Sequence, residues 1–138
     1  MPKMVLLAAY LNLASNDLSE YARKIEVTAE VEDKDVTNYA SAGWKEVLPG
    51  LASGELGLEL LQDVAATELD SIMWPLFIAR QNVPFRVRLN NAAVSTSNPE
   101  YSGSVLIKGW NPIQGSIGDE ASVSVTYPTS GAITRTTA

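Results

Sequence analysis

Strict alternation of apolar and polar residues marks two strands in the first half of the chain, Arg23–Glu32 and Gly54–Leu61. The apolar positions are Ile25, Val27, Ala29 and Val31 in the first and Leu56, Leu58 and Leu60 in the second. A period of two predicts half-buried strands, with one face on a core and the other in water. If the strands pair, their wet faces form a surface rich in carboxylates. Because like charges directly opposite each other destabilise a strand pair, we expect either a stagger or an outside reason for these charges.

Shorter patterns predict the remaining strands. They fall at Met4–Tyr10, at Phe85–Leu89, at Tyr101–Trp110, at Ala121–Tyr127 and at Ala132–Thr136. Clusters of Asn, Pro, Gly and Ser separate them, as in Asn91–Pro99 and Asn111–Gly118, and predict loops or turns. The residues Asn12, Ser15, Asn16 and Asp17 also indicate a turn, and Asp17–Tyr21 is compatible with one helical turn.

Helical spacing occurs once. Leu69, Ile72, Met73, Leu76 and Phe77 share one helix face. Asp63 or Thr67 is a suitable N-cap. Pro75 lies inside this segment, where it removes a backbone hydrogen bond, so we expect a kink or an early end there.

These elements predict a mainly β, α+β fold. About seven strands form two packed antiparallel sheets, a β-sandwich or barrel-like arrangement, with one flanking helix. At 138 residues, we expect one domain spanning 1–138.

The connection between the two alternating strands, about residues 33–54, is unusually long. It is rich in Gly, Ala and Ser, yet it holds Trp44, Val47, Leu48 and Leu51. Long connections in compact domains are usually functional or disordered, and apolar anchors argue against disorder. We therefore expect an assembly element.

Composition narrows the possible chemistry. The chain contains no Cys and no His, which excludes disulfides, thiolate nucleophiles, His bases and the usual zinc and haem ligands. The formal charge of −6 disfavours general nucleic-acid binding. Residues 1–70 carry 13 acidic and 5 basic side chains, whereas residues 71–138 carry 3 acidic and 5 basic. This asymmetry favours head-to-tail contact between copies, although charges that simply follow exposed strands explain it equally well.

No group of residues forms a convincing catalytic or metal site. The pairs Glu55 with Glu59 and Asp119 with Glu120 are better explained as solvated strand or loop carboxylates than as a glycosidase pair. Asp33, Asp35 and Asn38 lack the glycine and closing glutamate of a calcium loop. We expect no enzyme activity, no cofactor and no metal. The apolar run Met4–Tyr10 is too short for a secretory signal or a membrane span, so we expect a soluble protein without a membrane partner.

A sequence resemblance extends over nearly the whole chain. Its elements are an acidic strand, then Asp35-Val36-Thr37, then Gly43 to Leu51 (GWKEVLPGL), then a Leu/Glu strand ending in Gln62-Asp63, a helix, the run Val105 to Pro112, and the ending from Val125 to Arg135. In this order they resemble the major tail tube proteins of long-tailed bacteriophages with non-contractile, siphovirus-type tails.

The resemblance implies a β-sandwich-like structural subunit that forms hexameric rings stacked into a hollow tail tube. It implies that the 33–54 connection reaches the neighbouring ring through Asp35, Thr37, Trp44, Leu48 and Leu51. The implied channel lining is Glu26, Thr28, Glu30, Glu55 and Glu59, together with Ser122 and Ser124. A carboxylate wall would repel DNA and let it slide through.

The resemblance also implies partners and a location. The partners are further copies of the chain and other tail proteins, namely the tape measure, tail terminator and distal tail proteins. DNA passes through the lumen without specific binding, and the protein resides in the virion after assembly in the host cytoplasm. Two alternatives remain open. One is a capsid decoration or head–tail joining protein, and the other is a β-sandwich carbohydrate-binding module using Trp44, Trp74 or Trp110.

Overall fold

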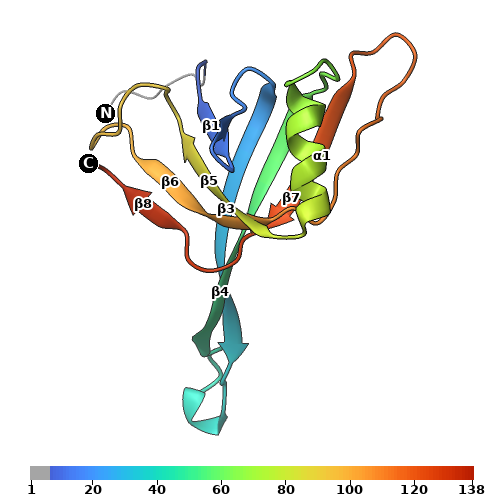
Figure 1. The fold of residues 1–138 in the computed structure, drawn as a ribbon. Helices are drawn as coiled ribbons and strands as arrows, with labels where there is room; N and C mark the ends of the chain where they lie inside the picture. The colour runs from blue at the N-terminus through green and yellow to red at the C-terminus, as the bar shows by residue number, and fades with distance from the viewer. Residues whose placement is uncertain (1–6) are drawn as a thin grey trace.

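Two antiparallel sheets form the body of the protein in the computed structural model, which describes residues 7–138 (Figure 1). The five-stranded sheet has the order β2-β1-β5-β6-β8 and the three-stranded sheet the order β3-β4-β7. The strands are β1 Tyr10–Leu13, β2 Asn16–Asp17, β3 Ala22–Asp35, β4 Val47–Leu61, β5 Asn82–Arg88, β6 Glu100–Leu106, β7 Ser122–Pro128 and β8 Thr134–Thr136. The helices are α1 Leu69–Ala79 and the short 3-10 helix η1 Tyr39–Ser41. The predicted fold class is confirmed.

The core lies between the sheets and is closed on one side by α1, which runs alongside β7 (Figure 1). Leu56, Leu58 and Leu60 point into it as their alternation predicts. From α1, Leu69 and Met73 are fully buried against them. The core also contains Leu11, Leu13, Leu18, Tyr21, Val83, Phe85, Val87, Val105, Ile107, Trp110, Val123 and Tyr127.

Two buried aromatic side chains attach the 107–121 connection to this core. The Trp110 indole N–H donates to Asp70 Oδ1 at 3.1 Å, which links the connection to α1. The Tyr127 hydroxyl donates to the Gly109 carbonyl at 2.9 Å, and burial raises the pKa of Tyr127. The polar group of each buried aromatic side chain therefore has a hydrogen-bond acceptor, as is usual for polar groups buried in apolar surroundings.

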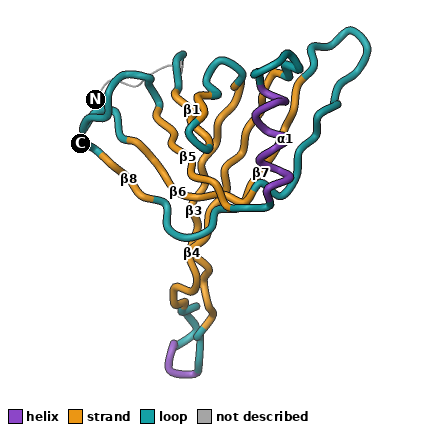
Figure 2. The backbone as a smooth tube through the Cα atoms, in the orientation of Figure 1, coloured by secondary structure: helices purple, strands orange, loops and turns teal. Residues whose placement is uncertain are grey.

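The largest difference from the predicted elements is the length of β3 and β4. Half of the residues expected to form a connection at 33–54 are strand, because β3 continues to Asp35 and β4 begins at Val47. Only residues 36–46 connect the two strands. The pair extends beyond every other element as a narrow hairpin (Figures 1 and 2). With both faces in water it needs no apolar alternation, so the pattern used for the buried parts could not reveal it.

The N-terminal elements are also displaced from their predicted positions. The part of the predicted first strand at Met4–Leu6 lies outside the described residues, and the observed strand begins only at Tyr10. Asn12, expected in a turn, lies within β1 and is buried, with its side-chain amide donating to the Tyr10 hydroxyl at 3.0 Å. Asp17–Tyr21 forms no helical turn, because Asn16–Asp17 pairs with β1 instead.

Several predicted boundaries of helices and strands in the second half of the chain were wrong. The helix runs through Pro75 to Ala79 without an early end, and its N-cap is Glu68 rather than Asp63 or Thr67. Thr67 has φ +65°, which is not a helix-capping conformation. Strand β5 stops at Arg88 and leaves Leu89 exposed. The strands predicted at Tyr101–Trp110 and Ala132–Thr136 are shorter, at Glu100–Leu106 and Thr134–Thr136.

Candidate assembly arm and channel face

The projecting part of the hairpin, residues 31–52, is called the arm from here on. Its strands pair from Val31 with Ala52 to Asp35 with Val47. Between these pairs the register shifts, so that Gly50 and Leu51 on β4 oppose Glu32 alone on β3, which is a β-bulge. A Cβ at Gly50 would lie 3.0 Å from the Glu32 Cβ, so a glycine allows this close approach.

Local hydrogen bonds order the tip of the arm. Asn38 caps η1 by accepting from the Ala40 N–H at 2.9 Å, and the Asn38 N–H donates to Ser41 Oγ at 3.1 Å. Near the base of the tip, the Thr37 N–H donates to Asp35 Oδ1 at 2.9 Å. Hydrogen bonds from the Thr37 side chain and backbone lower the pKa of Asp35. The two predicted loop residues Asp35 and Thr37 thus hold the tip in shape.

The arm exposes the apolar side chains that the sequence singled out. Trp44 is 79% exposed, Leu48 55% and Leu51 77%. The arm also exposes four apolar side chains that were not included in the predicted site, namely Val31, Val36, Tyr39 and Val47. None of the three anchors folds back onto its own body, so the arm presents an apolar surface with no partner among residues 7–138.

The outward face of the three-stranded sheet carries the predicted channel residues. Thr28 pairs with Glu55 and Glu30 with Ser53, while Lys24 lies opposite Glu59. The expected stagger is present, because no two carboxylates on this face of β3 and β4 are direct partners in the described ladder. On β7, Ser124 lies opposite Glu59, and Ser122 lies opposite Leu61.

Cations compensate part of this face. Lys24 Nζ lies 3.8 Å from Glu26 Oε2, and Arg23 Nη1 lies 3.8 Å from Glu59 Oε1. Within residues 7–138, Glu30 and Glu55 form no ion pair. The strands of the three-stranded sheet carry 7 acidic and 3 basic residues, whereas those of the five-stranded sheet carry 2 acidic and 3 basic. The two sheets therefore differ in the sign of their charge.

The other residues weighed from the sequence are not gathered into one site. Trp44 lies on the arm, Trp74 on α1 and Trp110 in the core, so the three do not form a common aromatic platform. Glu120 pairs with Arg23, and in the described part of the chain no cluster of acidic residues is arranged to hold a metal ion. Among residues 7–138, no helix has the length and apolar character needed to span a bilayer.

Two solved structures contain a chain similar to this one over almost its whole length. One is a chain of the virion of a native gene transfer agent particle, with a TM-score of 0.73 and 21% identity over 94% of this chain and 95% of that chain. The other belongs to the tail of an empty gene transfer agent particle, refined with helical and C6 symmetry, with a TM-score of 0.72, 23% identity and the same coverage. This chain shares their fold. No protein-family model and no curated protein matches the sequence.

Proposed function

We propose that the protein is a structural subunit of a bacteriophage-type tail, forming hexameric rings that stack into a hollow tail tube. The observation that carries the proposal is the arm, which projects from the body and leaves Trp44, Leu48 and Leu51 exposed. An apolar projection of this kind is typical of an interaction site. This chain shares its fold with a chain of a C6-symmetric tail, which supports six subunits per ring.

The edges of the three-stranded sheet support closure into a ring. Strands β3 and β7 lie at its two ends, and the outer edge of each pairs with no other strand in the described residues. Free edges invite pairing with another chain. Contact between β3 of one copy and β7 of the next is head-to-tail, and such contacts close into a ring when the rotation permits. Closure would remove every free edge of this sheet.

The polar face of the same sheet would then line the channel. Glu26, Thr28, Glu30, Glu55 and Glu59 project from this face, with Ser122 and Ser124 on the adjacent strand. Since DNA is a dense polyanion, an acidic wall prevents it from adhering during passage. The protein therefore acts as a passive conduit and not as an enzyme, and it resides in the virion after assembly in the host cytoplasm.

The partners follow from the tube architecture. Copies of the chain contact one another within and between rings. The ends and the interior of the tube contact the other tail proteins, namely the tape measure, the tail terminator and the distal tail proteins.

Electron microscopy of the purified protein tests the tube. Long hollow tubes with a regular ring repeat are expected at high subunit concentration. Persistent monomers or trimers that bind capsids would overturn the proposal in favour of a decoration or joining protein.

Charge reversal on the polar face of the three-stranded sheet tests whether this face lines the channel. Glu30 and Glu55 form no ion pair within residues 7–138, so Glu30→Lys with Glu55→Lys changes the charge of the face without breaking a described salt bridge. These tubes should retain DNA, and the retention should weaken steeply with salt, with a slope of about −0.9 per phosphate contacted. A matched control reverses Asp17 and Asp119, which lie outside this face. Equal DNA retention by both variants would show that the face does not line the channel.

A further inference from the structure

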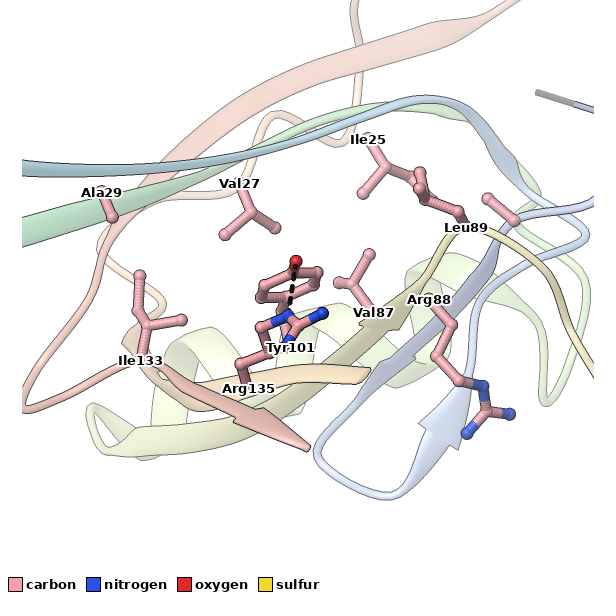
Figure 3. Close-up of a pocket in the computed structure, with 10 residues that line it drawn as sticks. Ile25, Val27, Ala29, Val87, Arg88, Leu89, Tyr101, Ile133 and Arg135 are labelled. Atoms are coloured by element: carbon pink, nitrogen blue, oxygen red, sulfur yellow. Dashed lines mark hydrogen bonds between the residues drawn. The ribbon is translucent and has the colours of Figure 1, made fainter. Parts of the chain in front are cut away.

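An apolar groove opens where β3 lies against the five-stranded sheet. It has a volume of about 420 Å³. Ile25 and Val27 of β3 point toward Val87 and Tyr101 on the opposite wall (Figure 3). Nothing in the described residues fills it, although α1 closes the corresponding space on the β7 side (Figure 1).

The groove continues toward the base of the arm. A second hollow of about 550 Å³ shares Ala29 and Ile133 with it and extends to Val31 and Ala52. The apolar face of β3 is therefore open along a line of alternate residues from Ile25 to Val31, roughly 20 Å of strand at 3.3 Å per residue. A surface of this extent is long enough to receive the end of a hairpin.

The rim of the groove carries a cation without an acidic partner. Arg135 Nε donates to the Tyr101 hydroxyl at 3.3 Å, and in residues 7–138 no carboxylate forms an ion pair with Arg135. Arg88 is already engaged, because its Nη1 lies 2.9 Å from Glu100 Oε1 and its guanidinium covers the Tyr10 ring at 4.0 Å. Figure 3 shows the Arg88 side chain directed away from the groove.

The arm is complementary to this groove in its charge and in its apolar side chains. Residues 31–52 include the acidic Glu32, Asp33, Asp35 and Glu46 against the basic Lys34 and Lys45. The net charge of the arm is therefore opposite to that of Arg135. Its tip carries Trp44, a residue type that often acts as a central interface anchor when buried in an apolar pocket. The arm cannot enter its own groove, because it extends away from the body (Figure 1).

We propose that this groove is the receptor for the arm of a second copy of the chain, with Trp44 inserted between β3 and the five-stranded sheet and the arm carboxylates facing Arg135. The inference rests on the proposed function and adds to it the surface on which one ring receives the next. It assigns Ile25, Val27 and Ile133, which pack against the core of their own subunit, and the groove residue Tyr101 a role in contact with a second copy.

Cross-linking tests the contact directly, because the chain has no cysteine. Lys45→Cys places a thiol beside Trp44, and Ala29→Cys places one on the groove rim. Treatment of assembled tubes with a short bis-maleimide should join copies into a ladder extending beyond six, since each arm reaches another ring. The control pairs Lys45→Cys with Ile117→Cys, a fully exposed site on the 107–121 connection, and should give no ladder.

Three results would contradict the inference. Tubes that form without cross-linking at Ala29 would place the arm elsewhere and leave the proposed function intact. A ladder that stops at six copies would assign the groove to a lateral neighbour within the ring. Failure of the wild-type chain to form tubes or rings would overturn the proposed function and this inference with it.

A double-mutant cycle gives a second readout. Trp44→Ala removes the anchor and Ala29→Trp obstructs the groove, so each should raise the critical concentration for tube assembly by about 30-fold, as expected for a hot spot. Since both remove the same contact, the double variant should be little worse than either alone. Ile117→Ala is the control and should leave assembly unchanged. Effects that multiply in the double variant would show that Trp44 does not occupy the groove. Thermal unfolding of each free subunit confirms that it is folded.

Discussion

Two leucines of the same strand should respond in opposite ways to truncation. Leu51 and Leu56 both lie in β4, but Leu51 is 77% exposed on the arm, whereas Leu56 is fully buried in the core. Leu51→Ala should change the free energy of unfolding of the isolated subunit by no more than about 0.5 kcal/mol. Leu56→Ala should reduce it by about 2–5 kcal/mol, because it removes buried methyl groups and leaves a cavity.

The order of effects should reverse on assembly. Burying a leucine side chain completely is worth about 1.5–3 kcal/mol, and three-quarters of Leu51 is available for burial, so the contact is worth about 1–2 kcal/mol. Leu51→Ala should therefore raise the critical concentration for assembly by a factor of about 5–30. Leu48→Ala, at a less exposed position, should have a smaller effect in the same direction.

Two measurements on the same preparations check this prediction. Urea denaturation of dilute, unassembled subunit reports the stability, and sedimentation of tubes at increasing concentration reports the assembly. If Leu51→Ala destabilises the isolated subunit as strongly as Leu56→Ala, the arm is packed on its own body. If Leu51→Ala leaves assembly unchanged, the arm is not an assembly element.

Three further predictions concern single positions. Gly54→Ala should lower stability by about 1–3 kcal/mol in thermal unfolding, because the new Cβ would lie 2.7 Å from a backbone carbonyl oxygen. Gly57→Ala, whose nearest atom is 3.7 Å away, should be tolerated, and equal losses would refute the steric reason. Carboxyl NMR should find the pKa of Asp35 below its usual value and rising in Thr37→Val. Since folding lowers the pKa of Asp35, the ionised carboxylate stabilises the folded protein at neutral pH, and this stabilisation is lost as the pH falls through the pKa of the folded state. An unchanged pKa of Asp35 in Thr37→Val would contradict this explanation. Tyr127→Phe should cost about 1 kcal/mol of unfolding free energy, whereas no loss would show that its hydroxyl contributes nothing.

The sequence predicted the buried parts of β4 and α1 correctly, because one face of each is buried. The leucines of 56–60 and the helix residues Leu69 and Met73 lie where their periodicity indicated, since burial on one face imposes that periodicity. Prediction failed for the parts of β3 and β4 that bury neither face, because nothing there imposes a periodic pattern. The extended ends of β3 and β4 are held by backbone pairing with both faces in water, so residues 33–35 and 47–53 resembled a loop. Asn12 was misplaced because its buried amide is satisfied by Tyr10, a contact that no local pattern encodes.

Of the two candidate surfaces, the sequence revealed the arm but not the groove. Trp44, Leu48 and Leu51 could be identified because apolar residues within a polar connection are conspicuous in the sequence. The groove could not be found, because its walls come from parts of the chain that are far apart in the sequence, such as Val27, Val87 and Ile133. The sequence placed each of these positions in a predicted strand, and only their arrangement in space shows that the face they share remains partly uncovered.

A helical reconstruction of assembled tubes by cryo-electron microscopy would show directly which sheet faces the channel and where the arm binds. We expect six copies per ring, the three-stranded sheet facing the channel with Glu30 and Glu55 toward the lumen, and the arm of each copy bound to a neighbouring ring. A reconstruction with the five-stranded sheet facing the channel, or with the arm folded against its own subunit, would contradict it.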